Sequence, residues 1–260
     1  MKPKDNSTAS VLKRAYHFRY SLVLEGIAVG ILAGLVISLF RWLLSNAEIL
    51  LANILAFGQR NAWFIPVWFV ILTVAALIVN QLLHWAPLIS GSGIPQVEGE
   101  MQGMIKQKWW RVLIAKFFGS LLTIGAGLSL GREGPSIQLG AMVGKGFAKI
   151  TRRIKMEERL LLTCGASAGL SAAFNAPLAG VLFSLEELHK NFSPEVLLST
   201  MAASISANFI SANVFGLQPV FTFQIQQHIP LHTYGTVILL GILLGLLGAG
   251  YNLSLIHIYI

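Results

Sequence analysis

Long, uninterrupted apolar runs are the feature that most constrains the fold of this chain. They cover approximately residues 22–44, 63–84, 109–128 and 234–252, and each approaches the roughly 20 residues that cross a bilayer as a helix. The runs are continuous and do not alternate with polar residues, which argues against transmembrane β-strands. Hydrophobic residues make up 55% of the chain and charged residues 12%, against about 25% charged in a soluble domain. The sequence therefore predicts an all-α polytopic protein in a lipid bilayer.

The basic residues gather in three stretches, which predicts the orientation of the chain. They lie before residue 20, in the loop at 103–111 and in the charged loop TRRIKMEER at 151–159, whereas the loop at 45–62 holds only one, Arg60. Basic residues accumulate in cytoplasmic loops. We therefore expect a cytoplasmic N-terminal tail over 1–20, cytoplasmic loops at 103–111 and 151–159, and an external loop at 45–62. The same rule accounts for the net charge of +8 without a nucleic-acid partner.

Small residues and helix breaks indicate how the apolar segments pack. Glycines recur every fourth residue at Gly26, Gly30 and Gly34, a spacing that lets helices approach closely. Several later segments are too short to span and each follows a Gly/Pro break. Broken helices are tolerated in lipid where the freed backbone is buried or lines a cavity, and in transporters they mark the binding site.

Two of these breaks carry polar residues between glycines: GSGIP at 91–95 and GREGP at 131–135. Proline fits the first turn of a helix, so each motif predicts a helix N-terminus. Unpaired backbone N–H groups and the helix dipole make such an end attractive to anions, and Ser92 adds a hydroxyl donor. Either motif alone is also compatible with a plain turn, but two in one chain favour a shared anion site.

Glu133 occupies the position where the dipole of the second helix favours a negative charge. We interpret it as a tethered competitor for the anion, which leaves when it is protonated; a simple helix cap is the alternative. Arg132 is expected to face an aqueous vestibule or to pair with backbone carbonyls, in a minor role.

Other carboxylates and one lysine lie in or beside apolar segments. Glu186 and Glu187 end the segment APLAGVLFSLEEL, and adjacent helical residues point about 100° apart, so one can face the interior while the other is solvated. Two solvated charges are an equally good interpretation. Lys116 and Glu98 each lack an obvious partner, and because a buried charge needs one, we hypothesise that they pair.

Enzymatic alternatives find little support. The chain has no GxxxxGK[ST] and no HExxH motif, and its single cysteine, Cys164, allows neither a disulfide framework nor a cysteine metal site. GASAG, at 165–169, has the GxSxG spacing of a serine hydrolase, but its setting is apolar, so we expect Ser167 to pack between helices. An intramembrane hydrolase remains a distant alternative, and we predict no enzyme, cofactor or metal site.

Four stretches, in this order, resemble the CLC family of chloride channels and chloride/proton antiporters: GSGIPQVEG, WWRVLIAKFFG, GREGPSIQLG and GASAGLSAAFNAPLAGVLFSLEE. The resemblance covers roughly residues 20–255 and is nearest to bacterial antiporters. It implies a homodimer with one anion pathway per subunit, in which each subunit has two inverted halves containing broken, partly re-entrant helices. The expected location is the inner or sole cell membrane.

The same resemblance implies roles for individual residues. Ser92 would contribute to a central chloride site, Glu133 would be the gating glutamate, and Glu187 would transfer protons on the inner side. The chloride-binding residues that it implies are Gly91, Ser92, Gly93, Ile94, Gly131, Arg132 and Gly134. An acid at Glu187 favours exchange over passive conduction, which stays the alternative function.

The family's second half is missing from this sequence. By this pattern residues 21–230 form the first transmembrane repeat and 231–252 begin the second. The ending LSLIHIYI resembles a translated sequencing adapter, so we expect 253–260 to be a non-native tail. A fragment that does not transport by itself is therefore a third hypothesis.

Overall fold

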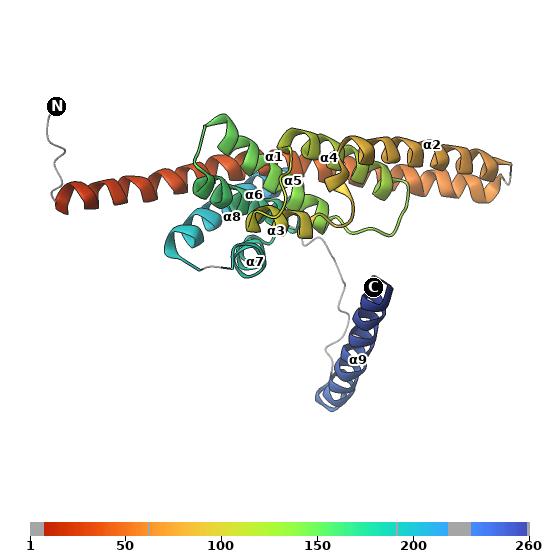
Figure 1. Cartoon of the computed structure of the whole chain (residues 1–260). Coiled ribbons are helices and arrows are strands. Elements are labelled where there is room, and N and C mark those ends of the chain that lie inside the picture. Colours follow the sequence, from red (N-terminus) through yellow and green to blue (C-terminus); the bar gives the residue numbers. More distant parts are fainter. Residues whose placement is uncertain (1–7, 62, 191, 218–229, 259–260) are drawn as a thin grey trace. The chain divides into compact units, whose positions relative to one another are not determined.

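The computed structural model describes residues 8–61, 63–190, 192–217 and 230–258, and within these ranges it is helical, with no strand (Figure 1). The α-helices are α1 (Thr8–Arg60), α2 (Phe64–Trp85), α3 (Ile94–Gln102), α4 (Trp109–Gly125), α5 (Glu133–Ile150), α6 (Lys155–Phe174), α7 (Pro177–Phe183), α8 (Pro194–Phe215) and α9 (Tyr234–Ile258). Short 3₁₀ turns cover η1 (Pro87–Ile89) and η3 (Leu231–Thr233), and a π-helix covers η2 (Ser184–His189). The all-α prediction is confirmed.

The chain divides into two compact units, residues 1–220 and 221–260. Among the residues that the structure describes, four helical segments have the length and composition to cross a membrane: Tyr20–Arg60, Phe64–Trp85, Pro194–Phe215 and Tyr234–Ser254. The last belongs to the second unit, where α9 runs from Tyr234 to Ile258. The prediction of a non-native tail falls on the end of this helix and on residues 259–260, which lie outside the described residues.

Close backbone contact between helices forms the core of the first unit. A Cβ on Gly30 of α1 would overlap the carbonyl oxygen of Ala203 of α8, and a Cβ on Gly26 would overlap that of Ser199. The close helix contact that the glycine spacing predicted is therefore present. Helices α5 and α6 meet in the same way, because Gly140 and Gly165 each leave room for the other's carbonyl oxygen.

Two predicted loops are shorter in the structure than the sequence indicated. The segment 45–62 was expected to be an external loop, but α1 continues to Arg60, because residues 45–57 contain no glycine or proline to stop the helix. The loop at 151–159 is shorter than expected, since α6 begins at Lys155. Glu157 explains this early start: it is favoured by the dipole of the first turn, and its Oε2 accepts a hydrogen bond from the Ile154 N–H at 3.3 Å.

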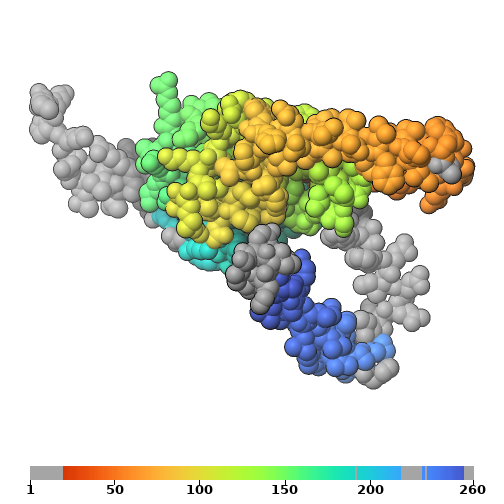
Figure 2. Space-filling view, turned by 45° about the vertical axis from the view of Figure 1, so that its right-hand side comes forward, coloured from red at the N-terminus to blue at the C-terminus, as the bar shows by residue number. Residues whose placement is uncertain are grey.

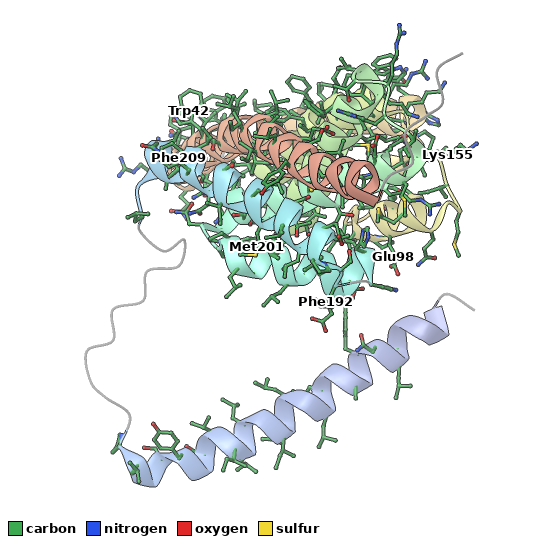
Figure 3. The ribbon with its side chains drawn as sticks, turned by 90° about the vertical axis from the view of Figure 1, so that its left-hand side faces the viewer. Trp42, Glu98, Lys155, Phe192, Met201 and Phe209 are labelled. Atoms are coloured by element: carbon green, nitrogen blue, oxygen red, sulfur yellow. The ribbon has the colours of Figure 1, made fainter. Side chains whose placement is uncertain are left out.

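The predicted broken helices are confirmed. Helix α3 has nine residues and α7 has seven, each opening at a proline in its first turn. Helix α4 ends at Gly125, three residues before the predicted limit, ahead of Gly127, whose φ is 91°. Figure 3 orients the unit: Glu98 and Lys155 lie towards one end, and Trp42 and Phe209 towards the other.

Candidate functional site

A cavity of about 560 Å³ lies between α2, α4 and the starts of α3 and α5. Its lining is mostly apolar, and one polar or charged residue of each Gly/Pro motif reaches it, Ser92 and Glu133, together with Ser90, which precedes the first motif. Lys116 of α4 adds a cation to the same wall. Pockets of this size that are apolar with a few polar groups are typical of small-ligand sites.

The two motifs are in direct backbone contact. A Cβ on Gly134 would overlap the carbonyl oxygen of Ser92 and lie 3.0 Å from the Ser92 Cβ. Only glycine therefore fits at residue 134 without moving the Ser92 loop. The N-termini of α3 and α5, which the sequence predicted separately, open at the same place.

The loop before α3 depends on left-handed backbone that glycine adopts readily. Gly91 has a φ of 68° and Gly93 a φ of 101°, and Gly93 immediately precedes the first residue of α3, Ile94. The Ser92 Oγ accepts a hydrogen bond from the Ile94 N–H at 3.3 Å. This turn leaves the Ser92 side chain exposed, beside the first N–H groups of the helix.

Glu133 is the first residue of α5, and Arg132 precedes it. The Glu133 carboxylate folds back over Gly131, where it would overlap a Cβ, and the side chain is exposed to the cavity. The Arg132 guanidinium carbon lies 5.5 Å from the ring centre of Phe174, at the end of α6. Arg132 is therefore drawn towards an aromatic ring of another helix, whereas Glu133 stays at the cavity.

The predicted pair of Lys116 with Glu98 is wrong. Lys116 is 3% exposed and its Nζ donates to the carbonyl oxygens of Ile89 and Gly91, at 2.9 and 2.8 Å. Glu98 instead lies 2.7 Å from the Lys190 Nζ. Backbone carbonyls of the turn before α3 satisfy the buried ammonium, so it needs no carboxylate and brings its charge close to Ser92.

Glu186 and Glu187 lie on η2, away from the residues that line this cavity, and both are exposed. The nearby exposed pair of Lys190 and Glu98 shares this region, and the hydrogen bond and charge of Glu98 raise the pKa of Lys190. The structure brings Ser92, Glu133 and Lys116 together in one cavity and leaves Glu187 in another part of the same unit.

Sequence reasoning missed a network of hydrogen-bonded polar side chains packed beneath the Ser92 loop. Lys145 Nζ lies 2.6 Å from Glu100 Oε1 and 2.6 Å from the Gln107 carbonyl oxygen. Gln138 Nε2 donates to Gln107 Oε1 at 2.9 Å and to the Leu88 carbonyl at 2.8 Å. The Gln138 side chain fills the space where Gly93 would carry a Cβ. A polar side chain inside the apolar run SIQLGAMVG was the signal that could have revealed it.

Two further observations concern enzymatic chemistry. Ser167 is fully buried inside α6, and its carbonyl oxygen touches the position where Gly180 would carry a Cβ, which is the helix-packing role expected of it. Within the described residues, no group of three or more His, Cys, Asp or Glu side chains is arranged to hold a metal ion.

Comparison with known proteins gives one family and a consistent set of relatives. The model of the family described as voltage gated chloride channel matches residues 75–259. The chain is 40% identical over 249 residues to the H+/Cl− exchange transporter ClcA of Vibrio cholerae, covering 90% of this chain and 51% of that protein. It is 35% identical over 239 residues to the transporter of the same name from Salmonella arizonae, covering 89% and 50%.

Solved structures agree with this result. A slow cyanobacterial Cl−/H+ antiporter matches with a TM-score of 0.75 at 32% identity, over 87% of this chain and 54% of that one. A CLC-type fluoride/proton antiporter matches with a TM-score of 0.69 at 25% identity, over 89% and 56%. The chain thus spans about half the length of the relatives that it matches.

Proposed function

The chain belongs to the voltage gated chloride channel family, and from that premise we propose that the protein moves chloride across a membrane in exchange for protons. The observation that carries the proposal is the contact between Gly134 and Ser92, by which two helix N-termini open onto one cavity beside Glu133. Relatives at 35–40% identity are named H+/Cl− exchange transporters, and structural relatives include Cl−/H+ and fluoride/proton antiporters.

The proposed anion site relies mainly on the partial positive charges of N–H groups and helix dipoles, and little on charged side chains. Backbone N–H groups at the starts of α3 and α5 and the Ser92 hydroxyl coordinate chloride, and the dipoles of both helices add positive potential. The participating segments are Gly91, Ser92, Gly93 and Ile94 on one side and Gly131, Arg132, Glu133 and Gly134 on the other. Lys116 contributes a charge held on the carbonyls of Ile89 and Gly91. Binding without a close ion pair suits an anion that must also leave.

Exchange follows if Glu133 competes with chloride for these same donors. The ionised carboxylate at the start of α5 is favoured by the dipole that also attracts the anion. Protonation removes the charge, so the side chain leaves and chloride enters. Proton and chloride occupancy are thereby linked. Glu187, exposed on η2, is the proposed group that passes the proton to or from the opposite side.

The surroundings of the transporter are part of the same proposal. We expect a homodimer in a bacterial inner membrane, with the N-terminal tail and the basic loop that precedes α6 on the cytoplasmic side. Reaction of single introduced cysteines with a membrane-impermeant reagent in intact cells tests the orientation: residue 156 should be protected and residue 61 labelled.

The decisive test measures coupling in liposomes. The full-length protein is reconstituted in vesicles loaded with chloride, an outward chloride gradient is imposed, and external pH is followed without a protonophore. Proton movement against its own gradient, driven by chloride, is the expected result. Chloride efflux without proton movement would replace exchange with passive conduction, and absence of both would remove the transport proposal.

Matched variants test the two carboxylates. Glu133→Gln should abolish proton coupling while chloride flux persists, because the competing charge is lost. Glu187→Gln should also uncouple, whereas Glu186→Gln, its neighbour on η2, should couple normally. Intact coupling in the Glu133 variant would contradict the proposed mechanism.

A further inference from the structure

A second cavity, separate from the one beside Ser92 and Glu133, is lined by an excess of cations. It measures about 640 Å³ and lies between the start of α4, the end of α5 and the start of α6. Six cationic side chains and two carboxylates reach it. In Figure 2 the yellow segment near residue 100 and the green segment near residue 150 adjoin on one face, at the place where these elements meet.

The two carboxylates are already used within the wall. Glu100 pairs with Lys145 at 2.6 Å, and Glu158 pairs with Lys149 at 2.7 Å. The cations left over are Lys106, Lys108, Lys155 and Arg159, and all four are exposed. No carboxylate among the described residues lies within ion-pair distance of these four, so the cavity has a formal charge of about +4 to be neutralised from outside.

Two of these lysines stand where their charge is unfavourable for the protein alone. Lys108 immediately precedes the first residue of α4, and Lys155 is the first residue of α6. The N-terminal end of a helix is positive, so a lysine there opposes the dipole, and an anion bound between the two ends would be attracted by both. A solvated cytoplasmic loop would not need its lysines at these two positions around one cavity.

The remaining lining has the character of a membrane interface. Trp109 and Trp110 line the cavity, and Trp110 packs edge-on against Trp85 with ring centres 5.5 Å apart. Outside the lining, Ile154 and Met156, on either side of Lys155, are 64% and 79% exposed. Tryptophan is enriched at headgroup depth, and basic pockets between membrane helices suit phospholipid headgroups.

We propose that this cavity binds the phosphate headgroup of an anionic phospholipid, with Lys106, Lys108, Lys155 and Arg159 as its cationic contacts. The tryptophans lie at the level of the headgroup, and the exposed apolar side chains beside Lys155 face the acyl chains. The site requires no transport activity, because it shares no lining residue with the cavity beside Ser92.

The test measures the melting temperature of the purified full-length protein in detergent while a probe is titrated. Cardiolipin should raise the melting temperature in a saturable way, because a ligand that binds only the folded state stabilises it. Phosphatidylcholine, which has no net charge, should not. Inorganic pyrophosphate separates the lipid from a soluble phosphate: an effect equal to that of cardiolipin would overturn the lipid assignment.

Charge variants locate the effect. Lys108→Gln with Lys155→Gln should raise the half-saturating concentration of cardiolipin roughly 30-fold, since each cation near an anionic surface contributes about five- to sixfold. Lys108→Arg with Lys155→Arg should bind like the wild type, and Arg60→Gln, which removes a charge elsewhere on α1, should stay within about twofold. Unchanged binding in the double glutamine variant would refute the site.

The same variants without lipid exclude a merely structural role. The double glutamine variant should melt no lower than the wild type, because two cations that oppose helix dipoles have been removed. A markedly lower melting temperature without lipid would mean that the lysines hold the fold, and would overturn the proposal.

Discussion

Helices α2 and α5 have similar lengths, 22 and 18 residues, but opposite relations to the rest of the protein. Helix α2 is strongly apolar and has no buried residue, whereas fourteen of the residues of α5 are buried, including Ser136, Gln138 and Lys145. Helix α2 has the length and composition of a membrane span, and α5 does not. In lipid, apolar side chains gain nothing by turning inward, so polar groups and small residues mark the core.

The largest expected effect tests whether the polar groups of α5 are essential to its burial. Lys145→Met leaves the Glu100 carboxylate, whose side chain is 10% exposed, with the Gln107 N–H at 2.6 Å but without its cation. This costs up to about 3–5 kcal/mol and should strongly lower the yield of folded protein or its melting temperature. Lys149→Met, one turn along the same helix, breaks the pair with Glu158, in which the lysine is 53% exposed, and should cost less than about 1 kcal/mol. Equal losses of stability in the two variants would show that the buried pair of α5 is no more important than the exposed one.

A rescue variant separates the lost pair from lost packing. Lys145→Met combined with Glu100→Gln removes both charges and should recover part of the stability, because no unpaired charge remains. No recovery would mean that the hydrogen bond from Lys145 to the Gln107 carbonyl carries the effect.

The next effect concerns the other buried lysine and the partner that the sequence suggested for it. Lys116→Met removes two hydrogen bonds from an ammonium group to the Ile89 and Gly91 carbonyls and should cost about 1.5–3 kcal/mol, read as a lower melting temperature. Glu98→Gln should leave the melting temperature nearly unchanged, because Glu98 pairs with the exposed Lys190. Similar losses in both variants would restore the pairing of Lys116 with Glu98.

This contrast also shows how far the sequence leads. The starts of α3 and α5 were predictable because each depends on a local Gly/Pro motif, at 91–95 and 131–135. The glycine spacing of α1 likewise predicted a close contact with another helix. The partners of Lys116 and Lys145 were not predictable. Glu100 lies 45 residues from Lys145, and the carbonyls that satisfy Lys116 belong to a turn 25–27 residues away. Such pairings depend on tertiary packing, which no local pattern records. The extension of α1 to Arg60 was not predicted because the first apolar run was ended at residue 44, although helix propensity stays high through 45–57.

Gly→Ala substitutions should show a third, smaller difference in stability between a buried position on α5 and a more exposed position on α1. Gly144→Ala forces a Cβ against the Leu161 carbonyl of α6 and should cost about 1–3 kcal/mol as overpacking. Gly58→Ala, in an exposed turn of α1, has one neighbour at 3.5 Å and should be neutral or slightly stabilising, because alanine favours a helix. Melting temperatures in detergent compare the two; a loss at Gly58 as large as that at Gly144 would show that backbone contact is not the cause.

The smallest effect is expected where hydrophobicity is greatest. Leu77 of α2 is 63% exposed, so in a bilayer its side chain contacts lipid in both the folded and the unfolded state. Leu77→Ala should therefore change the free energy of unfolding by no more than about 0.5 kcal/mol. Leu139 of α5 is fully buried, and the same substitution there opens a cavity. Unfolding in lipid nanodiscs measures both, and the difference isolates packing, since the transfer of a leucine from water contributes to neither. If Leu77→Ala were as costly as Leu139→Ala, the face of α2 would be covered by protein in the full-length protein, and this face would mark a contact with another part of the molecule or with a second copy.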